Sequence, residues 1–126
     1  MNANEMTFGI EIETVAPKSA IENDGLRIGG YHNGIQVPYL PQGWKAERDG
    51  SIDVRNTPGG QACEIVSPIL RGAEGLAQVA EVLQTLEAKG HRVNVTCGVH
   101  YVEWLIMRSW RWKLLNNRGL MASNST

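Results

Sequence analysis

Long apolar runs are absent from this chain. No stretch reaches the length of about 18 apolar residues that a membrane-spanning helix needs. The first five residues, Met-Asn-Ala-Asn-Glu, are polar and lack the apolar segment of a secretory signal. We therefore expect a cytoplasmic protein with no membrane partner.

Cysteine is also scarce. The chain has two cysteines, Cys63 and Cys97, which are far apart and form no Cys-x-x-Cys pair. Such a pattern does not build a disulfide framework, so we expect reduced thiols that pack as small apolar residues. The 126 residues are 42% hydrophobic and 20% charged, which is typical of one globular domain.

Neither sign of charge dominates the whole chain, but the two signs are unevenly distributed. All 13 acidic residues lie at or before Glu103, whereas four of the 12 basic residues follow it, together with three of the four tryptophans. Basic and aromatic residues together can bind nucleic acid or a membrane surface. We favour a divergent extension or the product of a reading-frame change. The expected division is a domain at residues 1–103 and a basic, Trp-rich tail at residues 104–126, with no nucleic-acid partner.

The spacing of apolar residues predicts an α+β fold. Strands are expected at residues 6–15, 44–48, 61–66 and 91–97. A long loop rich in Pro and Gly should cover residues 16–43, with one helical turn near residues 19–23. Between Ala73 and Lys89 the apolar residues follow the helical period, and Gly90 supplies a C-terminal stop. We expect a mainly antiparallel sheet covered on one face by this amphipathic helix.

Acidic and apolar side chains alternate at residues 7–14, Thr-Phe-Gly-Ile-Glu-Ile-Glu-Thr. Alternation is the period of a β-strand, so Glu11 and Glu13 should lie on one face and Ile10 and Ile12 on the other. Their Cα atoms would be roughly 6.6 Å apart, so the two carboxylates could hold one divalent cation or two adjacent ones. The alternative is a solvated acidic face on an ordinary half-exposed strand, which is the commoner outcome for an isolated Glu-x-Glu.

Four motifs in a fixed order resemble the amidoligase family. They are Phe-Gly-Ile-Glu-Ile-Glu at residues 8–13, Trp-x-x-x-x-Asp-Gly-Ser-Ile at 44–52, Glu-Ile-Val-Ser-Pro-Ile-Leu at 64–70 before Gly-Leu and the helix, and Val-Asn-x-Thr-Cys-Gly-Val-His at 93–100. The resemblance covers residues 6–100. After Gly-Val-His the family would continue with a second histidine and a C-terminal half that carries basic, phosphate-facing residues. Tyr-Val-Glu-Trp stands there instead, so we expect an incomplete domain that is inactive on its own.

The resemblance implies a glutamine-synthetase-like catalytic domain and a ligase that joins a carboxylate to an amine. This reaction is uphill in water, so ATP would convert the carboxylate into an acyl phosphate. Mg²⁺ or Mn²⁺ would neutralise the phosphates and requires oxygen ligands. The implied metal ligands are Glu11, Glu13 and Glu64. The substrates would be a small-molecule or peptide carboxylate and an amine, which the sequence does not identify.

Further residues have candidate roles, and most have a structural alternative. Asp49 and Glu64 are the candidate catalytic residues: Asp49 could hold the amine and accept its proton, or could bond its own turn. Glu64 could instead be a surface residue paired with a lysine. By resemblance, His100 would contact ATP phosphate or a metal. Ser51 and Arg71 are further candidates for nucleotide binding, but Ser51 could only shape its turn and Arg71 could pair with a carboxylate at the helix start.

Two other functions also fit this residue set. An inactive fragment could retain metal or nucleotide binding without the basic, phosphate-facing residues. A two-metal hydrolase would use the same carboxylates without ATP. Nucleotide dependence of metal binding would distinguish the hydrolase from the ligase.

Overall fold

The structure is a computed structural model, and it describes residues 6–52, 54–55, 57–92 and 99–101. For residues 99–101 only the backbone is considered. The predicted tail at residues 104–126 and Cys97 lie outside the described residues.

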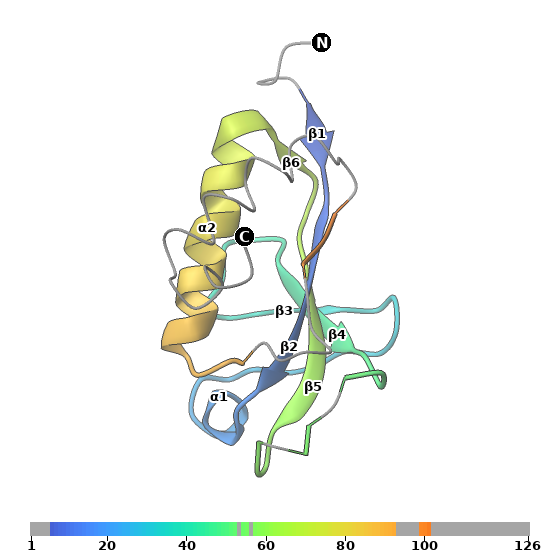
Figure 1. The fold of residues 1–126 in the computed structure, drawn as a ribbon, viewed down its shortest axis with the longest axis vertical. Coiled ribbons are helices and arrows are strands. Elements are labelled where there is room, and N and C mark those ends of the chain that lie inside the picture. Colours follow the sequence, from blue (N-terminus) through green and yellow to red (C-terminus); the bar gives the residue numbers. More distant parts are fainter. Residues whose placement is uncertain (1–5, 53, 56, 93–98, 102–126) are drawn as a thin grey trace, which may run out of the picture.

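The described part of the chain is an α+β structure with two sheets and one longer helix (Figure 1). The larger sheet has five strands in the order β3-β4-β5-β2-β7. These strands are β2 (Ile10–Ala16), β3 (Ile35–Gln36), β4 (Lys45–Arg48), β5 (Gln61–Val66) and β7 (Val99–Tyr101). The smaller sheet pairs β1 (Thr7–Phe8) with β6 (Leu70–Arg71). Every pairing between these strands is antiparallel, as predicted.

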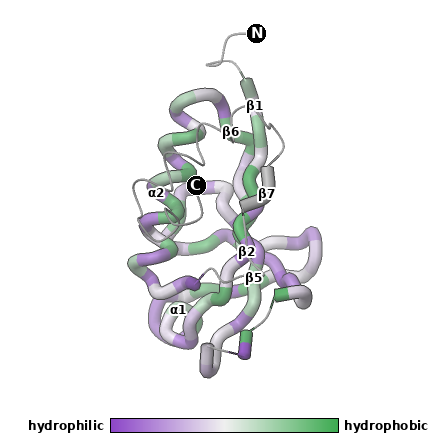
Figure 2. The backbone as a smooth tube through the Cα atoms, viewed as in Figure 1, coloured by the Kyte–Doolittle hydropathy of each residue, from purple (hydrophilic) through white to green (hydrophobic). Residues whose placement is uncertain are grey.

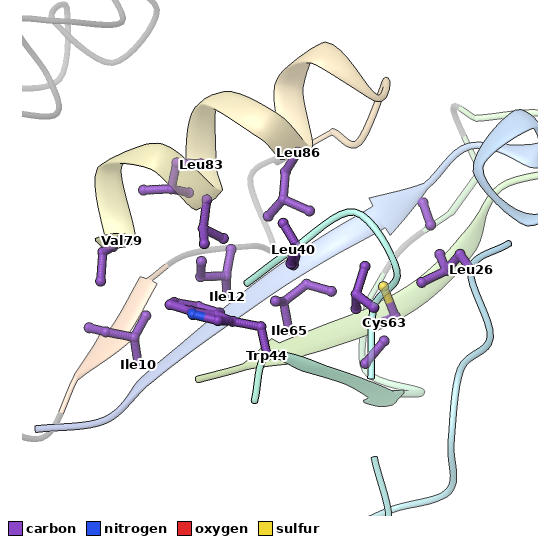
Figure 3. Packing of buried hydrophobic residues seen from close by; sticks show 14 of the residues in the cluster. Ile10, Ile12, Leu26, Leu40, Trp44, Cys63, Ile65, Val79, Leu83 and Leu86 are labelled. Atoms are coloured by element: carbon purple, nitrogen blue, oxygen red, sulfur yellow. The ribbon is translucent and has the colours of Figure 1, made fainter. Parts of the chain in front are cut away.

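Helix α2 (Gly72–Ala88) covers one face of the larger sheet, and the hydrophobic core lies between them. Figure 3 shows Val79, Leu83 and Leu86 of the helix directed toward Ile12 and the neighbouring side chains of the sheet. Along α2 hydrophilic and hydrophobic residues alternate in Figure 2, as expected of a helix with one buried face. Neither α2 nor the short helix α1 (Lys18–Glu22) is long and apolar enough to cross a membrane.

The bounds of α2 agree closely with the prediction. The helix begins one residue before Ala73 and ends at Ala88. Gly90 has φ of 88°, a left-handed conformation that glycine adopts without strain, and its N–H donates to the Glu87 carbonyl at 3.0 Å. The predicted C-terminal stop is therefore confirmed.

The first predicted strand is divided in two, with Gly9 between β1 and β2. Ser67 follows β5 and bonds β2 twice: its N–H donates to the Ile10 carbonyl, and its Oγ accepts from the Ile10 N–H, both at 2.9 Å. Pro68 then has no N–H to continue the ladder, so pairing resumes only at Leu70, between β1 and β6. Ser-Pro therefore marks the junction of the two sheets.

The other strand predictions have mixed outcomes. β5 has the predicted bounds, and β4 begins one residue later than predicted. The helical turn expected inside the long loop is α1. Of the strand predicted at residues 91–97, Arg92 forms a bridge with Val15, and residues 93–97 lie outside the described range. The sequence analysis did not predict β3, β6 or β7, which are only two or three residues long.

Candidate functional site

The carboxylates of β2 lie on the sheet face that α2 does not cover. Ile10 and Ile12 are buried in the core, whereas Glu11 is exposed and Glu13 is half-buried. Adjacent residues of a strand point to opposite faces. The prediction that Glu11 and Glu13 share one face is therefore confirmed.

Strand register extends this acidic face over two further strands. Glu13 is paired with Glu64 of β5, and Glu64 is paired with Glu47 of β4. Directly opposed residues share a face and have Cβ atoms about 4.5–5.5 Å apart. We use "acidic face" for Glu11, Glu13, Glu47 and Glu64 together with Asp49, which follows β4.

Glu64 lies at the centre of the acidic face. Burial is the largest cause that raises its pKa, to about 8, followed by a hydrogen bond with the Glu11 carboxyl group and by the charges of Glu11, Asp49 and Glu47. Glu64 therefore keeps its proton to a higher pH than an ordinary glutamate, and its carboxyl group hydrogen-bonds that of Glu11. It pairs with no lysine among the described residues, so the alternative of a surface ion pair is not observed.

Glu47 is a functional candidate that the sequence analysis missed. Its residue is 9% exposed, and its carboxylate has no hydrogen bond or ion pair within the part of the chain that the structure describes. A Cβ on Gly34 would lie 3.6 Å from Glu47 Oε2, which shows that the segment before β3 passes close to this carboxylate. A buried carboxylate without a partner is costly, which makes Glu47 a candidate cation ligand. The sequence pattern could have identified Glu47, because Lys45 and Glu47 alternate with Trp44 and Ala46 as in a strand with one apolar face.

Asp49 bonds its own turn, as the structural alternative predicted. Its Oδ1 accepts hydrogen bonds from the Ser51 N–H at 3.0 Å and from Ser51 Oγ at 2.6 Å. Ser51 thus orients the Asp49 carboxylate. An open cavity of about 430 Å³ begins beside it and is lined by Tyr31, Arg48, Asp49, Gly50 and Glu64.

The remaining predicted residues differ in their placement. His100 of β7 is paired in register with Glu11, so its backbone borders the acidic face. Arg71 lies in β6 and is paired with Thr7 of β1. Thr7 is four positions from Glu11 and six from Glu13, which at about 3.3 Å per residue corresponds to roughly 13 Å and roughly 20 Å. Arg71 therefore lies in the smaller sheet beyond the Glu11 end of the acidic face, and it forms no ion pair with Glu74 among the described residues.

The donor chemistry of the acidic face fits a hard divalent cation, although the side chains are not arranged around one. Carboxylate oxygens are the ligands that Mg²⁺ and Mn²⁺ prefer. Within the described ranges no group of three or more His, Cys, Asp or Glu side chains has the geometry of a metal site. Instead a proton joins Glu11 and Glu64. A cation would have to replace that proton, and the carboxylates would have to turn toward it.

Comparison with known proteins gives one match. A family model described as "Putative amidoligase enzyme" matches residues 4–101. No curated protein and no solved structure matches the chain. The matched range includes the whole acidic face and ends at the last residue of β7.

Proposed function

The chain belongs to the amidoligase family, and from this membership we propose that its acidic face is the metal- and nucleotide-binding side of an ATP-dependent carboxylate–amine ligase. The proposal includes a glutamine-synthetase-like catalytic domain. The observation that carries it is the set of carboxylates in register on three neighbouring strands, with Glu64 at its centre.

Electrostatics supports a cation at this position. Folding brings Glu13, Glu64 and Glu47 side by side, and Glu64 avoids part of the repulsion by keeping its proton to a higher pH than an ordinary glutamate. Glu47 is buried without a donor among the described residues. A divalent cation would compensate both the repulsion around Glu64 and the buried charge of Glu47, because it supplies two positive charges where the acidic residues converge. Repulsion of this kind persists in folded proteins mainly where function requires it.

Each residue of the acidic face then has a role. Glu11, Glu13 and Glu64 would hold Mg²⁺ or Mn²⁺, which when bound neutralises phosphate charge and orients the phosphates. Asp49, oriented by Ser51, would bind the positively charged amine and accept its proton. His100 remains a candidate for a phosphate contact because its backbone lies beside Glu11. Arg71 stays a candidate for nucleotide binding, although it lies in the smaller sheet beyond the Glu11 end of the acidic face.

Metal-dependent stability tests this proposal. A ligand that binds only the folded state stabilises it by mass action, by about 2.7 kcal/mol at a concentration of 100 Kd. Mg²⁺ or Mn²⁺ should therefore raise the Tm of the chain, and the double variant Glu11→Gln/Glu13→Gln should lose this response. The matched control is Glu74→Gln/Glu81→Gln, which removes two exposed carboxylates of α2. Equal metal affinity of both double variants in calorimetric titration would show that the metal assignment is wrong.

Repeating the metal titration with nucleotide distinguishes the ligase from the two-metal hydrolase. For a ligase, ADP or a non-hydrolysable ATP analogue should strengthen metal binding, because metal and phosphate are bound together. Tight metal binding that is indifferent to nucleotide would favour the hydrolase.

A further inference from the structure

Two neighbouring cavities open on either side of the Asp49 turn. The first is the cavity of about 430 Å³ that contains Asp49 and Glu64. The second has a volume of about 400 Å³ and shares Arg48, Asp49 and Gly50 with the first. A single ligand that crosses the turn at Gly50 could therefore reach both.

The two cavities differ in chemistry. Apart from the shared turn, the first contains the Glu64 carboxyl and the ring of Tyr31, which is 74% exposed. The second is lined by the aliphatic side chains of Ile28, Ile52 and Val54, together with parts of β5 and the residue before it. A cavity with two carboxyl groups thus adjoins one with three aliphatic residues, and the exposed Arg48 lines the rim of both.

We propose that the amine substrate is a primary alkylamine rather than free ammonia. Its ammonium group lies against the Asp49 carboxylate and the ring of Tyr31, and its aliphatic body lies against Ile28, Ile52 and Val54. This inference rests on the proposed function for its reaction, but not for the binding itself.

Size and chemistry both favour this ligand. Both cavities are far larger than the space that one ammonia or water molecule occupies. The Asp49 carboxylate and an aromatic ring attract an ammonium group. Ammonia offers nothing to the aliphatic side chains, whereas an alkyl chain removes their surface from water, and each buried methylene should improve the affinity about fourfold.

The test is a titration of the full chain in the presence of Mg²⁺. The Ile and Val methyl groups are isotope-labelled, and NMR monitors their signals during the titration. The probes are the chlorides of ammonium, methylammonium, propylammonium and pentylammonium, with 1-pentanol as an uncharged control. We expect the affinity to rise stepwise with chain length, and pentylammonium to shift the methyl signals of Ile28, Ile52 and Val54. Pentanol should bind at least tenfold more weakly than pentylammonium.

Gly50 offers a variant that should block the site without disturbing the fold. A Cβ at Gly50 would meet no atom within 4 Å, and its φ is outside the left-handed region, so alanine fits there. The new methyl group would stand on the wall that both cavities share, and Gly50→Val would extend it. We expect at least a fivefold loss of pentylammonium affinity in Gly50→Val and a smaller loss in Gly50→Ala. Gly30→Ala is the matched control, since a Cβ there also meets no atom within 4 Å and Gly30 lines neither cavity.

The outcomes separate this inference from the proposed function. An affinity that does not depend on chain length, or methyl shifts that spare Ile28, Ile52 and Val54, would overturn the alkylamine site even if metal and nucleotide bind. Chain-length dependence that Gly50→Val weakens and Gly30→Ala preserves would support the site even if the chain binds no nucleotide.

Discussion

His91 is the most strongly constrained polar residue on the helix-covered side of the sheet. It is 8% exposed, its Nδ1 lies 3.1 Å from Thr14 Oγ1, and its Nε2 lies 2.7 Å from Tyr39 Oη. Burial lowers the pKa of His91 to about 4, partly opposed by the charge of Asp24. Burial is also the main cause that raises the pKa of Tyr39, with contributions from Cys63 and Asp24. A neutral imidazole bonded on both nitrogens therefore joins β2 to the long loop.

Stability should fall when acid protonates His91 in the unfolded chain. The folded-state pKa of about 4 lies below the ordinary value of 6.5, so the neutral form is favoured by folding. The resulting stability is fully present above about pH 6.5 and is lost as the pH falls toward about 4. Between about pH 7 and about pH 4.5 His91 should contribute a loss of about 2–3 kcal/mol. The raised pKa of Glu64 acts in the opposite direction, because folding favours its protonated form, so the His91 contribution is measured as the difference in the free energy of urea unfolding between the wild type and His91→Asn.

Comparison of two variants separates the contribution of His91 to the pH dependence of stability from the contribution of the carboxylates. His91→Asn removes the titrating group, so on acidification it should lose about 2–3 kcal/mol less stability than the wild type, although it also weakens the fold at neutral pH. His32→Asn, at an exposed histidine, should retain the wild-type slope. Equal slopes in both variants would contradict the assignment of His91 as the titrating residue.

At the scale of elements, α2 approaches the smaller sheet closely at Gly75. A Cβ added there would lie 2.8 Å from Leu70 Cβ and 3.1 Å from the Phe8 ring. This contact gives a structural reason for the Gly-Leu that follows the third motif in the sequence. Gly75 allows the first turns of α2 to rest on β1 and β6, while later turns cover the larger sheet.

Gly75→Ala should therefore destabilise the protein although alanine is the better helix former. Helix propensity favours alanine by about 1 kcal/mol, but crowding in a packed core typically costs about 1–3 kcal/mol. We expect a net loss of about 1 kcal/mol in urea unfolding. The exposed Ala77→Gly, in the same helix, should lose a similar amount through propensity alone. If Gly75→Ala were more stable than the wild type, Leu70 and Phe8 would have moved at little cost, and the close contact would not require glycine.

Elements whose signals are local were predictable from the sequence, and those that depend on distant contacts were not. The apolar spacing of α2 and the alternation in β5 lie within one segment, and both were predicted almost to the residue. The division at Gly9 depends on Ser67, which is 57 residues from Ile10 in the sequence. β3 and β6 are two residues long and carry no periodicity of their own. Only pairing with neighbouring strands defines them.

At the scale of the whole molecule, the sheet separates the hydrophobic core from the candidate site. The face of Ile10 and Ile12 carries the core beneath α2, and the opposite face carries the carboxylates. Alternation in β2 predicted Glu11 and Glu13, and the motifs predicted Glu64 and Asp49. Glu47 was missed because its burial and its pairing with Glu64 depend on strand order. The place of Arg71 in the smaller sheet was not predictable for the same reason, because it depends on the pairing of β6 with β1.

A molecule that concentrates carboxylates on one face should become more stable when they are neutralised. Glu47→Gln/Glu64→Gln removes the buried unpaired charge and its coupled neighbour, so the metal-free free energy of unfolding should rise by about 1–3 kcal/mol. The same variant should lose most of its stabilisation by Mg²⁺ or Mn²⁺, because its amides are weak ligands for hard cations.

The control is again Glu74→Gln/Glu81→Gln, which also replaces two glutamates by glutamines but acts on exposed positions of α2. Its stability should change by less than about 0.5 kcal/mol, and its response to metal should match that of the wild type. Urea unfolding with and without metal measures both quantities. If the acidic-face variant is less stable than the wild type in metal-free buffer, the carboxylates contribute to the fold itself, and their convergence is no evidence for a bound cation.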